Sequence, residues 1–309
     1  MGGAVSASSL GGFDAVGGDF DASGFERALG AWCEPYALRC SKPFLAKWYN
    51  EKRSGLGGST QIIEGPESAI CFALYSVPGF LEVVADHYRR RRPAADSAES
   101  ETSTFVDSTT DEILEKLRAS VAPALDAVVV NIEAGPPYYH VQCIGDVAGI
   151  DQHVAAEHIE GEDAAQWREE LSDALEDSRD TKMWGTDPAT LRKIFGVNVH
   201  PVWGGWYAYR ALVVLRGASV ENLPRPEPLK FLSQEDARRI LKEYNLNAPE
   251  CRWRDLMAQG HPPEKQYTTD EYFFFTEVSD KKRLRWLELR AAQLDREAGL
   301  GLRVPCLSR

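Results

Sequence analysis

Long apolar runs and closely spaced cysteines are both missing from this 309-residue sequence. A helix that crosses a bilayer needs about 20 predominantly apolar residues, so we expect no membrane span. No two of the six cysteines have the C-x-x-C spacing of a zinc or redox site. With no secretory segment either, the sequence predicts free thiols in the reducing cytoplasm.

Positive charge is also scarce. Lysine and arginine total 35 against 47 aspartate and glutamate residues, which gives a net charge of −12. Nucleic acids and anionic membranes attract basic surfaces, so we expect neither as a partner. The one basic run, Arg89–Arg92, is interpreted as a solvated helix end that favours the negative helix dipole.

Short catalytic motifs are absent as well. The sequence has no P-loop, no G-x-G-x-x-G after a strand, no H-E-x-x-H and no G-x-S-x-G. Six scattered histidines do not predict a hydrolytic triad. We therefore assign no catalytic residue and no metal ligand from sequence motifs.

What is present is an irregular alternation of strand and helix patterns. Residues 1–25 are rich in Gly, Ala and Ser and predict a disordered leader. One domain is expected over residues 26–298, with an acidic helical insertion at about 156–183 and a tail at 299–309. Apolar runs predict strands at 68–77 and 126–133. Amphipathic spacing predicts helices at 25–33, 44–52, 78–92, 107–120, 164–180, 233–244 and 280–297. Ser108 and Ser233 are the expected N-caps of two of them. Without a regular βαβ repeat, the order favours an α+β fold.

The stretch Val197–Leu215 is apolar at both ends and has the turn signal His200–Gly205 in its middle. It predicts a β-hairpin. Arg210 lies within the second apolar run, where an unpaired charge would be costly. Either it pairs with a core carboxylate or it points into a ligand pocket beside the hairpin. The many aromatic residues of this region suit a large planar ligand, and an aromatic-rich core explains them equally well.

Several short motifs follow one another between Cys33 and Leu289. They are FLAKWYNE at Phe44–Glu51, GDVAG at Gly145–Gly149, WG at Trp184-Gly185, GVNVHPVWGGWYAYRALVVL at Gly196–Leu215 and WRD at Trp253–Asp255. In this order they resemble the CblC-type cobalamin-processing proteins, the methylmalonic aciduria and homocystinuria type C family. The longest, with its G-G-W-x-A-x-R core, is the most specific.

This resemblance implies a single cobalamin-processing domain with a flavin-dependent nitroreductase-like sandwich, a mostly antiparallel sheet flanked by helices. It implies binding of base-off cobalamin and removal of its upper axial ligand. Cyanide would leave by reduction, with electrons from FMN, FAD or a flavoprotein reductase. Alkyl groups would leave by attack of glutathione. A downstream cobalamin-trafficking protein would receive the product, and the chain would be a monomer or a ligand-induced homodimer. A non-catalytic cobalamin chaperone and a flavin-dependent reductase of small molecules are the alternatives.

The resemblance also assigns residues. Arg210 and Arg283 fall on glutathione-binding arginines, with Lys282 as a competitor for the second. The cobalamin-binding positions are Asn131, Tyr139, His140, Val141, Gln142, His153, Phe195, Gly196 and Tyr209.

Some positions depart from the family pattern. Asp146 replaces the histidine of H-V-A-G, Gln259 stands where a third glutathione arginine is expected, and His153 replaces a tyrosine. His153 also belongs to Asp151-Gln152-His153, which resembles the D-x-H-x-x-G motif with which some cobalamin enzymes ligate cobalt. Ala156 replaces the glycine of that motif, so a structural polar patch is the alternative. These departures make cobalamin binding a safer prediction than glutathione-dependent dealkylation.

Overall fold

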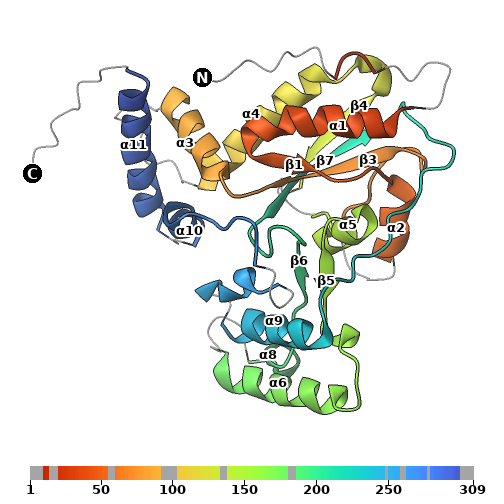
Figure 1. Cartoon of the computed structure of the whole chain (residues 1–309), viewed down its shortest axis with the longest axis vertical. Coiled ribbons are helices and arrows are strands. Elements are labelled where there is room, and N and C mark those ends of the chain that lie inside the picture. Colours follow the sequence, from red (N-terminus) through yellow and green to blue (C-terminus); the bar gives the residue numbers. More distant parts are fainter. Residues whose placement is uncertain are drawn as a thin grey trace, which may run out of the picture.

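The structure is a computed structural model that describes residues 10–13, 20–54, 60–91, 103–132, 138–179, 186–247, 250–257, 262–276 and 279–299. An antiparallel sheet lies at the centre of its upper half (Figure 1). The strand order is β1-β3-β7-β4, and β2 also pairs with β3. The strands are β1 (Leu38–Cys40), β2 (Phe44–Leu45), β3 (Ile70–Ser76), β4 (Ala127–Asn131) and β7 (Ala208–Leu215). The sequence thus predicted β3 and β4 correctly, because both are apolar, β-branched runs.

Helices cover this sheet and give it a buried core. In Figure 1, α1 and α4 lie above the sheet, α2 and α5 lie below it, and α3, α10 and α11 pack toward its left end. The bounds are α1 (Ala22–Cys33), α2 (Ala46–Ser54), α3 (Phe80–Arg91), α4 (Ser103–Ser120), α5 (Val141–Ala148), α10 (Thr269–Thr276) and α11 (Asp280–Glu297). The fold is therefore α+β, as the sequence predicts. None of the helices within the described residues has the length and apolar character needed to cross a bilayer.

A smaller sheet organises the lower half of the molecule. Strands β5 (Gln152–Val154) and β6 (Val197–Val199) form an antiparallel pair, with His153 opposite Asn198. The helices of this lower half are α6 (Ala164–Ser178), α8 (Pro188–Leu191), α9 (Gln234–Leu246) and the short helix η7 (Arg252–Asp255). Val154, Val199, Ile240 and Trp253 contribute to a second apolar core here. Ser233 accepts a hydrogen bond from the backbone of Asp236 and caps α9 as predicted.

The predicted hairpin at 197–215 is wrong. β6 pairs with β5, whereas β7 pairs with β3 and β4, so the two arms belong to different sheets. The turn between the two strands contains a bridge between His200 and Gly204 and a hydrogen bond from the Trp206 backbone N–H to the Trp203 carbonyl. The two apolar segments do form strands, as predicted. Each of them, however, pairs with strands from other parts of the chain and not with the other.

The leader was also predicted incorrectly where the structure describes it. Leu10 and Phe20 are buried in the main core, Phe13 packs against it, and α1 already begins at Ala22. Aromatic and aliphatic side chains in a Gly-rich segment are sufficient to dock it on a sheet. Residues 1–9 and 14–19 lie outside the described residues, as does most of the 299–309 tail.

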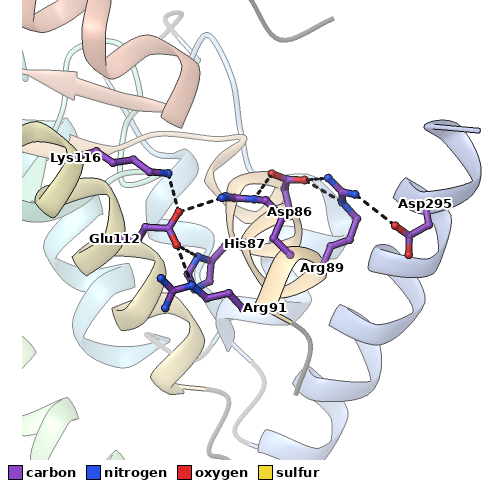
Figure 2. A network of polar contacts seen from close by, with 8 residues as sticks. Asp86, His87, Arg89, Arg91, Glu112, Lys116 and Asp295 are labelled. Carbon is purple, nitrogen blue, oxygen red and sulfur yellow. Dashed lines mark hydrogen bonds and ion pairs between the residues drawn. The ribbon is translucent and has the colours of Figure 1, made fainter. Parts of the chain in front are cut away.

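The basic run is not simply a solvated helix end, because its arginines form ion pairs that join three helices (Figure 2). Arg90, Arg91 and Lys116 all contact the Glu112 carboxylate of α4, and His87 lies 3.1 Å from it. Arg89 joins Asp86 to Asp295 of α11. Ser108 does not cap α4, which begins at Ser103. It lies inside the helix and contacts the His87 ring.

Candidate functional site

Two cavities meet beneath the main sheet, around the start of α5. The larger has a volume of about 640 Å³ and is lined by residues of α2, α5, β5 and the segment before α9. The smaller measures about 230 Å³ and lies among α5, β6, the start of β7 and η7. Gln142 lines both cavities. The larger volume falls within the roughly 300–1,000 Å³ of ordinary small-molecule sites.

Most of the predicted cobalamin-binding residues lie at these cavities. His140, Gln142 and His153 line the larger one, and Val141, Gln142, Gly196 and Tyr209 line the smaller one. The predicted residues thus lie in one region although they come from four separate segments of the chain.

Asn131, Tyr139 and Phe195 line neither cavity. The Asn131 amide donates to Asp111 of α4 at 3.0 Å. The Tyr139 ring lies 6.2 Å from the ring of Tyr49, centroid to centroid. Phe195 is covered by the cations of Arg179 and Lys193, each 5.1 Å from its ring centroid.

The first turn of α5 is fixed by a buried tyrosine. The Tyr49 hydroxyl accepts a hydrogen bond from the His140 backbone N–H and donates to the Gln61 carbonyl, both at 2.9 Å. His140 caps α5 because its Nδ1 accepts from the Cys143 backbone N–H at 3.4 Å. An accepting Nδ1 places the proton of the neutral ring on Nε2. His140 therefore offers the larger cavity a hydrogen-bond donor.

Asp151 is the buried polar centre of the region, with an exposed fraction of 1%. Tyr207 and Tyr209 both donate their hydroxyls to Oδ2, the former at 2.5 Å, and the Asn198 amide donates to Oδ1 at 2.9 Å. Burial raises the pKa of Asp151 to about 6, although these three donors oppose the shift. Gly145 of the GDVAG motif makes room for this cluster. A Cβ there would lie 2.2 Å from Asp151 Oδ1 and 2.5 Å from the Tyr209 hydroxyl.

Asn198 connects this carboxylate to His153. The Asn198 amide group donates to Asp151, so its Oδ1 faces His153 Nδ1, 2.8 Å away, as an acceptor. Nδ1 must then carry the proton, and Nε2 keeps its lone pair. Burial lowers the pKa of His153, despite the hydrogen bond from Asn198 that opposes this. The ring is therefore neutral in a defined tautomer.

Gly196 supports the other edge of the same ring. A Cβ at this position would lie 2.6 Å from His153 Cε1 and 2.9 Å from Nε2. Only glycine lets the β6 segment approach the imidazole this closely. Asp151, Asn198 and Tyr207 were missed by the sequence analysis as site residues. Asp151 had a signal in its D-x-H motif, but nothing local to Asn198 indicates its partners.

Arg210 lies at a β-bulge in β7. Tyr209 pairs with Tyr75 and Ala211 with Leu74, so the β3–β7 register skips Arg210. Its Nε donates to Ser76 Oγ at 3.0 Å, and its guanidinium lies 5.0 Å from the Phe80 ring centroid. Bulges redirect side chains in this way.

The charge of Arg210 also acts on a carboxylate of α4. Burial raises the pKa of Asp107, and the nearby positive charge of Arg210 opposes that shift. Arg210 is buried, with an exposed fraction of 5%, and lines neither of the two cavities. Asp107 is exposed on α4, so this electrostatic effect is not a pairing of Arg210 with a core carboxylate.

Arg283 lies on α11, with its guanidinium 6.0 Å from the Phe274 ring centroid. Its Nε is buried and has no hydrogen-bond partner among the described residues. No contact joins it to Arg210 within the described part of the chain. Gln259 and Trp184-Gly185 lie outside the described residues.

The G-G-W and W-R-D motifs form hydrogen bonds with each other next to the smaller cavity. The Gly205 backbone N–H donates to the Arg254 carbonyl at 3.0 Å, and the Arg254 side chain donates back to the Gly205 carbonyl. Trp206 donates to the Asp255 carboxylate at 2.7 Å, and the Arg254 guanidinium lies 4.9 Å from the Trp253 ring centroid. The G-G-W turn and the W-R-D helix thus pack together and form one side of the smaller cavity.

The described residues contain no cluster of three or more histidine, cysteine, aspartate or glutamate side chains placed to hold a metal ion. What the region offers is a mixed cavity with one imidazole donor at His140 and one imidazole acceptor at His153. Such a surface can bind a large ligand that carries amide groups or a metal with an open coordination position.

Comparison with solved structures identifies a similar fold. The B12-trafficking protein CblC of Caenorhabditis elegans superposes with a TM-score of 0.62 at 18% sequence identity, covering 85% of this chain and 94% of that one. The antiparallel sheet and its flanking helices are therefore shared.

Curated relatives carry one recurring name. The cyanocobalamin reductase / alkylcobalamin dealkylase of Homo sapiens is 23% identical over 239 residues, which are 76% of this chain and 71% of that protein. The protein of the same name from Bos taurus is 32% identical over 92 residues, 29% of this chain. The chain spans about a third, 31%, of the length of this bovine relative.

A family model extends the match over most of the chain. The model of the methylmalonic aciduria and homocystinuria type C family matches residues 40–285. That range includes both cavities, the Asp151 cluster and the interlocked G-G-W and W-R-D motifs. The chain therefore belongs to the methylmalonic aciduria and homocystinuria type C family.

Proposed function

We propose that this protein is an enzyme of cobalamin processing that binds the cofactor base-off and removes its upper axial ligand. The observation that carries the proposal is the convergence of His140, Gln142, His153, Gly196 and Tyr209 on two adjoining cavities. Family membership and the name of the curated relatives support the same substrate.

Reductive decyanation is the first activity we propose. Loss of the lower benzimidazole ligand removes electron donation to cobalt, which makes its reduction easier. One electron, from reduced FMN or FAD or from a flavoprotein reductase, converts cyanocobalamin to cob(II)alamin, and cyanide leaves with its electron pair. The protein contributes by holding the corrin in this coordination state.

Glutathione-dependent dealkylation is the second activity. A glutathione thiolate would attack the cobalt-bound carbon, forming an S–C bond while the Co–C electron pair stays on cobalt. Arg210 and Arg283 are the proposed carboxylate-binding groups, since arginine pairs with carboxylates in a bidentate fork. Arg210 is already engaged with Ser76 and Phe80, so thiol binding requires these contacts to rearrange. We therefore rank dealkylation below decyanation.

A cobalamin chaperone without turnover is the second candidate, and one observation favours it. Asp146, where the family has histidine, forms an ion pair with Lys52 at 2.5 Å on the wall of the larger cavity. The Asp146 carboxylate only accepts hydrogen bonds, whereas the imidazole of a histidine there could also donate one. Transfer of the cofactor to a downstream trafficking partner is compatible with both candidates, and so is dimerisation on ligand binding.

Anaerobic absorbance spectroscopy tests the proposal. Cyanocobalamin mixed with reduced FMN should give the cob(II)alamin spectrum much faster with the protein than without it. Gln142→Ala should slow the reaction, whereas Gln166→Ala on the exposed face of α6 should not. An unchanged rate with a base-off spectral shift would select the chaperone. Bound flavin without corrinoid affinity would select a small-molecule flavin reductase.

A further inference from the structure

The side-chain amide of Gln152 has a fixed orientation at the wall of the larger cavity. Its Oε1 accepts hydrogen bonds from the backbone N–H groups of Phe231 and Leu232, at 2.8 and 3.0 Å. Because only the oxygen of an amide can accept these bonds, the NH₂ group occupies the other side. This NH₂ group donates to no other described residue, and Gln152 lines the larger cavity. Gln152 therefore offers hydrogen-bond donors to a ligand there.

The His153 imidazole, next in the chain, offers the opposite polarity. Its Nδ1–H donates to Asn198 Oδ1 at 2.8 Å, and Asp151 orients that amide at 2.9 Å. Nε2 therefore keeps its lone pair, and within the described part of the chain nothing donates to it. His140 carries its proton on Nε2, because its Nδ1 accepts from the Cys143 backbone N–H. The larger cavity thus has one oriented acceptor and donors from two side chains.

Charged side chains at the same cavity do not favour an anionic ligand. Asp146, Glu157 and Glu160 line it together with Lys52 and Lys230. The Lys52 ammonium is already paired with the Asp146 carboxylate at 2.5 Å. Because the three carboxylates outnumber the two amines, a carboxylate on the ligand would enter a site with excess negative charge.

A primary carboxamide satisfies both polarities, because its carbonyl accepts and its NH₂ group donates. A carboxylate can only accept. It could pair with Gln152 or His140, but it would leave the lone pair of His153 Nε2 facing a negative oxygen, which is costly. Corrinoids carry acetamide and propionamide side chains around the rim of the macrocycle, and the propionamides are the longer of the two.

We propose that Gln152 and His153 bind the propionamide side chains of the corrinoid and so select fully amidated corrinoids over those with a free carboxylate. Gln152 donates to a carbonyl, and His153 Nε2 accepts from an NH₂ group. Both residues determine specificity at the rim of the corrin; neither contacts cobalt, and no proton is transferred. This inference rests on the proposed function, because it requires corrinoid in the larger cavity.

Absorbance titration of the wild-type protein with matched corrinoids tests the proposal. The probes are cyanocobalamin and its three monocarboxylic acids, in each of which one propionamide is hydrolysed to a propionate. We expect at least one acid to bind roughly tenfold or more weakly than cyanocobalamin at neutral pH, the scale of one lost hydrogen bond to a charged group. If all three acids bind within about twofold of cyanocobalamin, the proposal is overturned while corrinoid binding stands. Failure of cyanocobalamin itself to bind would instead refute the proposed function.

Two variants assign this selectivity to the two side chains. The carboxylate of Gln152→Glu can still accept from the backbone N–H groups but cannot donate, so the affected acid should bind still more weakly than cyanocobalamin. His153→Phe keeps a ring beside Gly196 and removes the lone pair, so the affinities of the acid and cyanocobalamin should move closer together.

Gln166→Glu is the matched control, because it makes the same change in net charge on the exposed face of α6, where Gln166 donates to Glu170. Repulsion of the acid by the negative net charge of the protein acts equally in both Glu variants and so cancels between them. Equal changes of the affinity ratio in these two variants would overturn the role of Gln152. An unchanged ratio in His153→Phe would overturn the role of His153, and if that variant fails to fold, Gln152→Glu still decides.

Discussion

Asp151 lies directly before β5 and His153 lies within it, yet it is Asn198 of the neighbouring strand β6 that joins them. Its amide group donates to Asp151 at 2.9 Å and its oxygen accepts from His153 at 2.8 Å. The β5–β6 register places Asn198 opposite His153 and so makes this connection possible. A buried carboxylate thereby determines the tautomer of an imidazole that faces the larger cavity.

Substitution of Gly196 should disturb the ring edge of His153. The added methyl group in Gly196→Ala would lie 2.6 Å from Cε1 and 3.1 Å from the Val154 carbonyl. We expect a loss of about 1–3 kcal/mol in unfolding free energy, the usual range for overpacking, together with weaker corrinoid binding. Denaturant titration and absorbance titration measure the two effects.

Gly30→Ala in α1 is the matched control. Its Cβ would meet only Cys40 Sγ at 3.6 Å, so alanine fits and should raise stability by about 0.5–1 kcal/mol through helix propensity. If the Gly196 variant binds corrinoid as tightly as the wild type, the His153 ring edge beside Gly196 does not contribute to corrinoid binding.

The pH dependence of stability should reveal the buried Asp151. Burial raises its pKa to about 6, so the folded protein binds a proton more tightly than the unfolded chain. This contribution is fully present below the unfolded pKa and is lost as the pH rises through about 6. Two pKa units correspond to roughly 3 kcal/mol.

Asp151→Asn should remove this contribution. Burial lowers the pKa of His200 to about 4, which destabilises the folded state as the pH falls, but both proteins share that effect. The difference in unfolding free energy between wild type and variant should therefore change between pH 4 and pH 6.5, measured by urea titration. If the unfolding free energies of the wild type and the variant change with pH in parallel, the pKa of Asp151 is the same in the folded and unfolded states.

Glu112 forms ion pairs with Arg90, Arg91 and Lys116 in the network of Figure 2. Burial would raise its pKa, but hydrogen bonds from Lys116 and Arg90 outweigh this and lower the pKa to about 2. Its stabilising contribution is present above the unfolded pKa and is lost as the pH falls toward 2. Glu112→Gln leaves Arg90, Arg91 and Lys116 with less opposing charge.

We expect Glu112→Gln to lose about 1–3 kcal/mol at low ionic strength, with partial recovery in 1 M salt as repulsion is screened. The measurement is thermal or urea unfolding at the two salt concentrations. Glu115→Gln is the control, because Glu115 pairs with Arg118 on the exposed face of α4 and should change stability by well under about 1 kcal/mol. An equal loss in both variants would refute the central role of Glu112.

Arg210→Lys should separate thiol chemistry from corrinoid binding. Lysine keeps the charge near Asp107 but cannot form a bidentate pair with a carboxylate. We expect glutathione-dependent dealkylation of methylcobalamin to fall roughly tenfold or more, from a lost interaction of about 1.5–3 kcal/mol. Corrinoid affinity, measured by absorbance titration, should stay unchanged. If both fall together, Arg210 supports the fold rather than the thiol step.

The sequence by itself determined the strands β3, β4 and β7, because apolar, β-branched runs have few alternatives to a buried sheet. It also determined the cap of α9 through Ser233, since capping depends on residues three apart. The resemblance to the family also indicated six of the residues that line the two cavities, His140, Val141, Gln142, His153, Gly196 and Tyr209.

Only the tertiary structure decided which elements pair and which polar groups meet. The arms of the expected hairpin separate into two sheets because β6 finds its partner in β5. Asp151, Asn198 and Tyr207 come together from three segments, a relationship that depends on strand register. A bulge in β7 gives Arg210 its contacts with Ser76 and Phe80. Local propensity cannot encode these contacts, because each depends on residues more than 40 positions apart in the chain.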